Sequence, residues 1–358
     1  MTETTFGEAL RWAMEDAMEA DDSVFVMAEG VDDEKSVFGT TAGLRDKFGA
    51  DRVVEMPNME AAGTGIAVGA AMVGRRPVMV HQRVEFSLLA AEQIIDNAAK
   101  IPWLTGGQFK VPMVIRMIIG RGWGQGPTHG QSLEHIWAGI PGLKVYMPST
   151  PQQAYLMLHH AIADDGPVIF LEHRWLYSHK ADVKRTRHAQ PVEAWPPRHA
   201  RAGADLTIVA AGYMVHEALK AAELLEINGI FCDVFDLRSL RPLELTQIVR
   251  RVGATGRLLC VENGHLHCSV GATVVAAVTS AAMSNMIQAP VVLACNEHPL
   301  PSSAALAEDY YPSVQNIVET GLQMCGSRVS ERLEKALGAY YKQKPPSDVP
   351  DNNFGGPF

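Results

Sequence analysis

Short apolar or β-branched runs alternate with longer amphipathic segments along the first half of the chain. We expect strands at Val24–Ala28, Arg52–Met56, Pro77–His81, Val111–Ile119, Leu143–Met147 and Pro167–Glu172, and helices at Glu60–Val73, Ser87–Lys100 and Pro151–Ala163. Strands that alternate with helices in this way predict an α/β fold, in which helices cover both faces of a mostly parallel sheet.

A stretch from about Lys184 to Ala204 has no clear period and carries several prolines, so it is predicted to be a linker. The alternation resumes after it, at Leu206–Ala210, Ile230–Phe235, Leu258–Glu262 and Val291–Ala294. A chain of 358 residues fits two domains, since domains typically hold about 100–200 residues. We expect a first domain over 1–185, a linker over 186–204, a smaller α/β domain over 205–342 and a flexible tail over 343–358 that is rich in Pro and Gly.

Composition narrows the class of protein. The hydrophobic content of 47% and charged content of 20% are typical of a soluble globular chain. A net charge of −9 argues against nucleic-acid binding, which needs clustered Lys and Arg. No apolar run approaches the roughly 20 residues that span a membrane, and the acidic N-terminal segment does not resemble a signal peptide. We therefore expect a cytoplasmic protein.

The cysteines and histidines do not predict a metal site. Five cysteines without a C-x-x-C pair indicate reduced, mostly buried thiols. His265, His267 and Cys268 are crowded along one short segment, which is unfavourable for a closed zinc site.

The stretch MPNMEAAGTGIAVGAAM, residues 56–72, places Glu60 between a predicted strand end and a helix that opens with small residues. Glycine allows another group to approach the backbone closely. A carboxyl group beside such a backbone can hold a flat heterocycle and exchange a proton with a ring nitrogen. The alternative is a surface glutamate in the first helical turn, where the helix dipole favours it.

Several blocks occur in one order along nearly the whole chain, among them VFVMAEGVDDEKSVFGTTAGLRDKFGADRV, THGQSLEHIWAGIPGLKVYMPSTPQQA and GIFCDVFDLRSLRPLE. With these blocks the chain resembles the beta subunit of the thiamine-diphosphate-dependent first component of 2-oxo acid dehydrogenase complexes, in the transketolase-like superfamily. The resemblance implies a pyrimidine-binding domain followed by a transketolase C-terminal-like domain.

The resemblance also implies roles for particular residues. Glu60 is expected to contact N1′ of the aminopyrimidine and to promote loss of the proton from thiazolium C2. Phe86 is expected to pack on the aminopyrimidine ring. His129, in GPTHGQS, is expected to meet the substrate or the incoming lipoyl group, since its near-neutral pKa suits proton transfer. Glu29 falls where the family keeps a glutamate near the cofactor; an exposed loop acid is the alternative.

The chain lacks the Gly-Asp-Gly element with which enzymes of this superfamily hold Mg²⁺ and the diphosphate. The resemblance therefore implies an alpha-type partner that carries Mg²⁺, a beta dimer within an α2β2 assembly, and contact with a lipoyl acyltransferase. It also implies a K⁺ ion held largely by backbone carbonyls of Met113, Ala161, Asp164 and Gly166.

Two departures from the family pattern concern the substrate. The string His81-Gln82-Arg83-Val84-Glu85 replaces an apolar one, and Asn58-Met59 replaces an apolar-then-Ser pair. We expect Gln82 and Asn58 near the cofactor, and Arg83 and His81 near a polar or anionic substrate. The alternative is that these side chains pair with one another, Arg83 with Glu85 or Glu55.

The sequence thus predicts a subunit that takes part in decarboxylation of a 2-oxo acid and acyl transfer to lipoamide. One alternative is a subunit of a split transketolase-like carboligase that acts on a polar or phosphorylated substrate. Another is a non-catalytic assembly homologue, against which the joint presence of Glu60, Phe86 and His129 argues.

Overall fold

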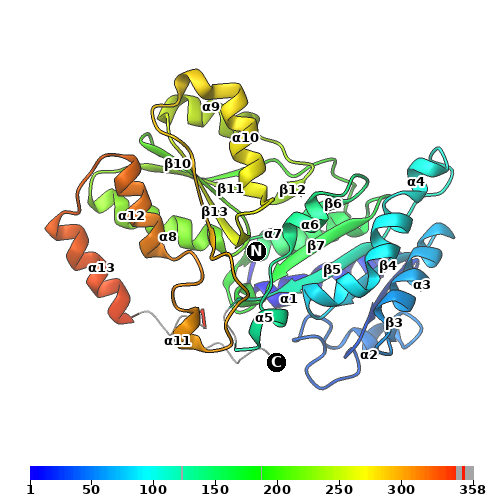
Figure 1. Cartoon of the computed structure of the whole chain (residues 1–358). Coiled ribbons are helices and arrows are strands. Elements are labelled where there is room, and N and C mark those ends of the chain that lie inside the picture. Colours follow the sequence, from blue (N-terminus) through cyan, green and yellow to red (C-terminus); the bar gives the residue numbers. More distant parts are fainter. Residues whose placement is uncertain (122–123, 187, 344–348, 351–358) are drawn as a thin grey trace. The chain divides into compact units, whose positions relative to one another are not determined.

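The computed structural model describes residues 1–121, 124–186, 188–343 and 349–350, which form two compact units (Figure 1). The first unit holds Met1–Arg121 and Ile136–Glu193. The second unit holds Ala194 and the described residues after it, together with those of Gly122–His135. The segment that carries His129 therefore belongs with the second unit, although it lies between strands of the first unit along the chain. Most of the predicted flexible tail lies outside the described residues.

The first unit contains a parallel sheet. Its strands lie in the order β6 (Lys144–Tyr146), β7 (Val168–His173), β5 (Val114–Ile119), β4 (Arg76–His81), β2 (Val24–Ala28) and β3 (Val53–Glu55). All runs predicted as strands in this half form strands. Their side chains are mostly apolar on both faces because helices cover the sheet, so the strands appear in the sequence as nearly continuous hydrophobic runs.

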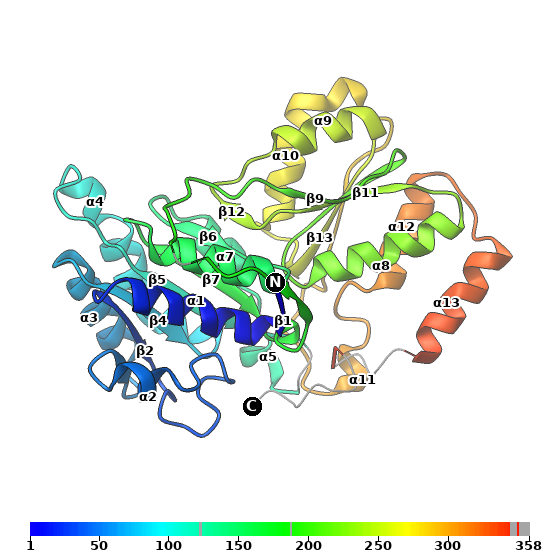
Figure 2. The same ribbon diagram turned by 180° about the vertical axis from the view of Figure 1, so that it is seen from behind.

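Three long helices pack in this unit. They are α1 (Phe6–Ala20), α3 (Glu60–Met72) and α7 (Pro151–Ile162). Helix α1 packs along α7, as Figure 2 shows, whereas α3 packs against β4. The short strand β1 (Thr2–Thr5) pairs antiparallel with β8 (Lys180–Val183). The predicted helices over 60–73 and 151–163 are confirmed.

The segment over 87–100 is largely helical, but the prediction of a continuous α-helix there is wrong. The chain forms a 3₁₀ helix at Val84–Ala90 and, after two residues with α-helical winding, a π-helix at Gln93–Ala98. The hydroxyl of Ser87 donates to the carbonyl of Val84, a local bond that favours the tighter winding. Changes of helical winding of this kind often accompany functional sites.

The second unit has its own sheet, in the order β14 (Val291–Cys295), β13 (Leu258–His265), β10 (Leu206–Ala210), β11 (Cys232–Asp236) and β9 (Arg198–Arg201). Only β9 is antiparallel to its neighbour. This strand lies inside the stretch predicted to be a linker. Its residues RHAR lack an apolar pattern because an edge strand is half exposed, so its sequence carried no strand signal.

Helices pack around this second sheet. They are α8 (Met214–Ile227), α9 (Thr246–Thr255), α10 (Val270–Ala282), α12 (Val314–Met324) and α13 (Glu331–Gln343), with the short α11 (Ala304–Ala307). Across the residues that the structure describes, no helix combines the length and the hydropathy needed to span a bilayer.

A buried ion pair lies in the core of the first unit. Arg116 on β5 and Glu172 on β7 are both fully buried, and two guanidinium nitrogens of Arg116 donate to the two carboxylate oxygens of Glu172. The hydroxyl of Tyr177 donates to the same carboxylate at 2.6 Å. Burial acts to lower the pKa of Arg116, but the neighbouring Glu172 outweighs it and the pKa is raised. Arg116 therefore stays charged inside the protein.

Candidate functional site

Glu60 is the first residue of α3 and follows the loop after β3. The preceding Met59, which occupies the N-cap position, provides no side-chain cap. Glu60 is half-buried, and it lies at the carboxyl edge of the parallel sheet, where ligands of open α/β sheets bind. Asn58, in the loop before it, is exposed.

Two more carboxylates lie near Glu60. Glu29 follows β2, and its pKa is raised by burial and by the negative charges of Glu60 and Glu55. The carboxylate of Glu55 accepts hydrogen bonds from the backbone N–H groups of Gly30 (2.8 Å) and Asp32 (3.1 Å), so it fixes the loop after β2. The structure therefore brings Glu29 and Glu60 into one acidic cluster, in which the pKa of Glu29 is raised.

Gln82 connects this cluster to β4. Its side-chain amide donates to the backbone carbonyl of Glu29 at 2.8 Å. A side chain on Gly30 would collide with that amide, because a Cβ there would lie 2.8 Å from its nitrogen, and Gly30 also has a positive φ of 79°. Gln82 thus holds the end of β4 against the end of β2. The predicted cofactor contacts of Gln82 and Asn58 stay predictions.

His81, the last residue of β4, points into the protein. It is 2% exposed, and its Nε2 lies 3.4 Å from the hydroxyl of Thr64 on α3. Burial lowers its pKa to about 4, so the imidazole is neutral at pH 7. In this setting His81 positions α3 on the sheet, and its predicted contact with a substrate stays a prediction.

Arg83 is also buried, at 5% exposure. Its guanidinium lies 5.1 Å from the centre of the Phe38 ring and donates to the carbonyl of Gln82, while Arg174 lies 4.9 Å from the same ring. Phe38 ends a left-handed turn in which Ser36 and the next two residues all have positive φ values, an arrangement that costs energy in non-glycine residues. The two arginines therefore hold a strained turn in place.

We expect Arg83→Met to lower the melting temperature and to leave substrate preference unchanged, because the lost contact supports the turn at Phe38. A buried cation–π contact contributes about 2 kcal/mol. Differential scanning fluorimetry and KM values for a set of 2-oxo acids check this result. Arg75→Met is the matched control, since Arg75 makes a similar contact with Phe25 at 5.6 Å from a half-buried position. A selective rise in KM for anionic substrates, without loss of stability, would contradict the expectation.

Phe86 lies in the 3₁₀ segment and is half-buried, and its backbone N–H donates to the carbonyl of Arg83 at 3.2 Å. It shares the first unit with Glu60 and Glu29. Its predicted stacking on a heterocycle stays a prediction.

The carbonyls predicted to hold K⁺ already have partners in the protein. Those of Met113 and Ala161 accept backbone N–H groups, and that of Asp164 accepts the guanidinium of Arg76 at 2.8 Å. The Asp164 carboxylate accepts the ammonium of Lys144 at 2.5 Å and the N–H of Gly166 at 2.9 Å. Two protein cations thus contact Asp164, one of the four residues expected to hold K⁺. The K⁺ site stays a prediction, and we derive no role from it.

His129 ends the short helix α5 (Gly126–His129) in the second unit. Two glycines set the path of this segment. Gly126 has a positive φ of 75°, and a Cβ on Gly130 would lie 2.1 Å from a methyl group of Leu300. His129 itself is half-buried. The GPTHG string therefore holds the histidine on a tight turn that packs against the loop after β14.

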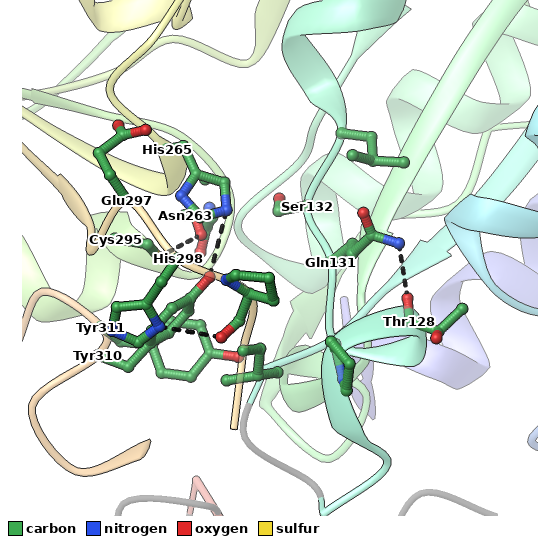
Figure 3. Close-up of a pocket in the computed structure, with 16 residues that line it drawn as sticks. Thr128, Gln131, Ser132, Asn263, His265, Cys295, Glu297, His298, Tyr310 and Tyr311 are labelled. Carbon is green, nitrogen blue, oxygen red and sulfur yellow. Dashed lines mark hydrogen bonds between the residues drawn. The ribbon is translucent and has the colours of Figure 1, made fainter. Parts of the chain in front are cut away.

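A cavity of about 500 Å³ adjoins this turn, entirely within the second unit (Figure 3). One wall consists of residues that flank His129 on both sides, and the other consists of residues at the carboxyl ends of β13 and β14 and in the loop that follows β14. In the sequence, the histidines near 265 were the one indication of this region. Among the described residues, no group of three or more His, Cys, Asp or Glu side chains is arranged to hold a metal ion.

A pair of buried acids lies beside the cavity. Glu134 is 4% exposed and accepts the hydroxyl of Ser132 at 2.5 Å. Glu262 on β13 is 8% exposed and accepts the N–H of Gly271 in the first turn of α10. Burial, and then the charge of Glu134, raise the pKa of Glu262 to about 8. The sequence analysis missed this pair because the two residues are far apart along the chain.

The raised pKa predicts how stability varies with pH. The pKa of Glu262 is 4.5 in the unfolded chain and about 8 in the folded protein. Between these two pH values the folded protein binds a proton that the unfolded chain does not, so the free energy of unfolding falls as pH rises through this range. We expect Glu262→Gln to be more stable than the wild type at pH 8 and to lose this advantage near pH 4. Urea unfolding at several pH values measures it, with the exposed Glu308→Gln as control. An equal pH dependence in wild type and Glu262→Gln would contradict the assignment.

Comparison with known proteins shows the structural class of the two domains. Residues 2–180 match the transketolase pyrimidine-binding domain, and residues 198–317 match the transketolase C-terminal domain. A solved structure described as a split gene transketolase, inactive beta4 tetramer, has the same fold, with a TM-score of 0.70 and 21% identity over 90% of this chain and 99% of that one.

Sequence relatives define the family. The beta subunit of the pyruvate dehydrogenase E1 component from Rickettsia bellii (strain RML369-C) is 35% identical over 90% of this chain and 98% of its own length. The 2-oxoisovalerate dehydrogenase beta subunit of Bacillus subtilis (strain 168) is 36% identical over 90% and 98%. The beta subunit of an acetoin:2,6-dichlorophenolindophenol oxidoreductase from Cupriavidus necator is 37% identical over 86% and 94%. The chain belongs to this family of transketolase-like E1 beta subunits, which confirms the resemblance and the two-domain α/β fold.

Proposed function

We propose that the chain is the beta subunit of a two-chain, thiamine-diphosphate-dependent 2-oxo acid dehydrogenase, which decarboxylates its substrate and passes the acyl group to lipoamide. The observation that carries this proposal is the acidic cluster of Glu60, Glu29 and Glu55 at the carboxyl edge of the first sheet. Family membership supports it, because the named relatives are beta subunits of enzymes of this kind.

The residues present fit one half of the cofactor. Thiamine diphosphate, when bound, supplies a carbon nucleophile and an electron sink. Glu60 would exchange a proton with N1′ of the aminopyrimidine, and Glu29, whose pKa is raised by burial and by the charges of Glu60 and Glu55, lies beside it. Phe86 would pack on the ring, and Gln82 keeps the strand ends together through its bond to the backbone of Glu29.

His129 acts on the reacting groups at a different step. It lies at the end of α5, on a turn fixed by Gly126 and Gly130, and an imidazole suits proton transfer to the substrate or to the lipoyl sulfur.

The isolated chain is expected to bind thiamine diphosphate weakly, because it has no Gly-Asp-Gly element for Mg²⁺ and its described residues form no metal-binding cluster. An alpha-type chain that carries this element should restore tight binding in an α2β2 assembly. Titration calorimetry with and without Mg²⁺, on the chain alone and on the reconstituted pair, tests the prediction. Tight Mg²⁺-dependent binding to this chain alone would show that it holds a diphosphate site of its own.

The oxo acid is identified by a substrate panel. The relatives are named for pyruvate, 2-oxoisovalerate and acetoin. The reconstituted pair is therefore supplied with pyruvate, branched-chain 2-oxo acids and acetoin, together with a lipoyl acyltransferase domain, and reductive acylation is followed. Product formed only from a sugar phosphate, without lipoyl acylation, would favour the carboligase alternative.

A further inference from the structure

The cavity beside His129 has the size and position of a ligand site. Its volume of about 500 Å³ falls within the range of small-molecule pockets. It lies at the carboxyl ends of two parallel strands, β13 and β14, which is where open α/β sheets bind ligands. The side-chain amide of Asn263, on β13, donates a hydrogen bond to the carbonyl of Ala211, which directly follows the central strand β10. The inner end of the cavity therefore lies near the middle of this sheet.

Two buried polar atoms at this inner end have no partner among the described residues. They are the Oδ1 of Asn263 and the Nδ1 of His265. Both residues line the cavity and are two positions apart on β13, so their side chains leave the same face of the strand. A buried polar atom without a partner costs about 1–3 kcal/mol, which indicates that something else satisfies these two.

The proton on His265 can be assigned from its neighbour. The hydroxyl of Tyr310 lies 3.2 Å from Nε2 of His265 (Figure 3). Burial, followed by the nearby Cys295 and Glu297, raises the pKa of Tyr310, so the phenol keeps its proton and can donate it to Nε2. The tautomer of His265 that accepts this bond carries its hydrogen on Nδ1. His265 thus offers a donor and Asn263 an acceptor, side by side.

One donor beside one acceptor matches a hydroxyl group, which both donates and accepts. An ammonium group cannot accept a hydrogen bond from His265, and an ionised carboxylate cannot donate one to Asn263. No Lys or Arg is found among the described residues that line the cavity, and Glu297 adds a negative charge at its rim. The rings of Tyr310 and Tyr311, in T-shaped contact at 4.8 Å, offer an apolar surface for C–H groups.

We propose that the second unit binds a small, neutral, polyhydroxylated molecule in the cavity formed by Asn263, His265, Tyr310 and the turn that carries His129. Because Thr128 and Gly130 line the cavity on either side of His129, the bound molecule restricts the movement of this turn. Binding in this cavity does not depend on the proposed function. Any consequence of the restricted turn for catalysis by His129 does rest on the proposed function.

The test uses the reconstituted pair and a panel of probes: ribitol, xylitol and glucose as polyols, with choline and inorganic phosphate as charged comparisons. Saturation-transfer NMR and calorimetry measure binding. We expect saturable polyol binding with a Kd of about 1 mM or lower, and Asn263→Ala to weaken it by about tenfold or more. Asn285→Ala is the matched control, since Asn285 lies in the same unit on the exposed η4 turn (Met283–Asn285).

His298→Ala provides a second variant that is expected to fold, because His298 is exposed at the rim. It should weaken polyol binding, and hydrogen exchange of the peptide that contains residues 124–135 should slow on binding in the wild type alone. Absence of saturable polyol binding, preference for choline or phosphate, or equal affinity in Asn263→Ala and Asn285→Ala would each overturn the proposal. None of these results depends on dehydrogenase activity, so failure here leaves the role of Glu60 to be judged separately.

Discussion

Glu60→Gln is expected to lower the rate of C2 proton exchange of bound thiamine diphosphate by about 10²–10⁴, the range typical of general acid–base groups. A glutamine amide has the size of the carboxyl group but cannot take or return a proton. Glu60 is half-buried at the helix start and makes no cap contact there, so the fold and the assembly with the partner should persist. NMR-detected exchange in the reconstituted pair, after rapid quenching, measures the effect directly.

Two further variants give this experiment its controls. Glu92→Gln removes an exposed acid of the same unit and should leave exchange unchanged. Glu29→Gln removes the neighbouring carboxyl of raised pKa and should produce a smaller loss than Glu60→Gln, because it acts through Glu60. Unchanged exchange in Glu60→Gln, with cofactor binding intact, would remove the central residue of the proposed site.

The sequence predicted correctly those strands and helices that are determined by the local pattern of apolar and polar residues. Strands such as Val24–Ala28 are buried on both faces, so their apolar runs have clear limits. Glu60 stood out because it lies where such a strand end meets a glycine-rich helix start. By contrast, β9 at Arg198–Arg201 is a polar edge strand whose pairing depends on a neighbour distant in sequence, so local pattern gave no sign of it.

The same reason explains what was missed at the candidate site. The raised pKa of Glu262 depends on Glu134, which lies far away along the chain, and the donor on His265 depends on Tyr310. Arg83 was predicted to face a substrate or to pair with Glu85 or Glu55, and that prediction stands untested. The fold adds a contact that the sequence did not indicate, between its guanidinium and the ring of Phe38 on a strained turn. Chemical character can be read from residue type, whereas burial and partners require the fold.

Glu172→Leu is expected to destabilise the protein by about 3–5 kcal/mol, because it leaves the charge of Arg116 buried without a partner. Arg116 is 0% exposed, and among the described residues its only carboxylate partner is Glu172, which also accepts the hydroxyl of Tyr177. Chemical denaturation of the chain, followed by circular dichroism, measures the loss.

The double variant Arg116→Met/Glu172→Leu distinguishes a lost charge partner from lost packing. It removes both charges and keeps similar volumes, so it should recover most of the stability that Glu172→Leu loses. Glu19→Leu is the control for an exposed pair, since Glu19 contacts Lys47 at the surface and should change stability by less than about 1 kcal/mol. If the double variant were as unstable as Glu172→Leu, the loss of stability would come from lost packing around the carboxylate and Tyr177. The unpaired charge of Arg116 would then not be its cause.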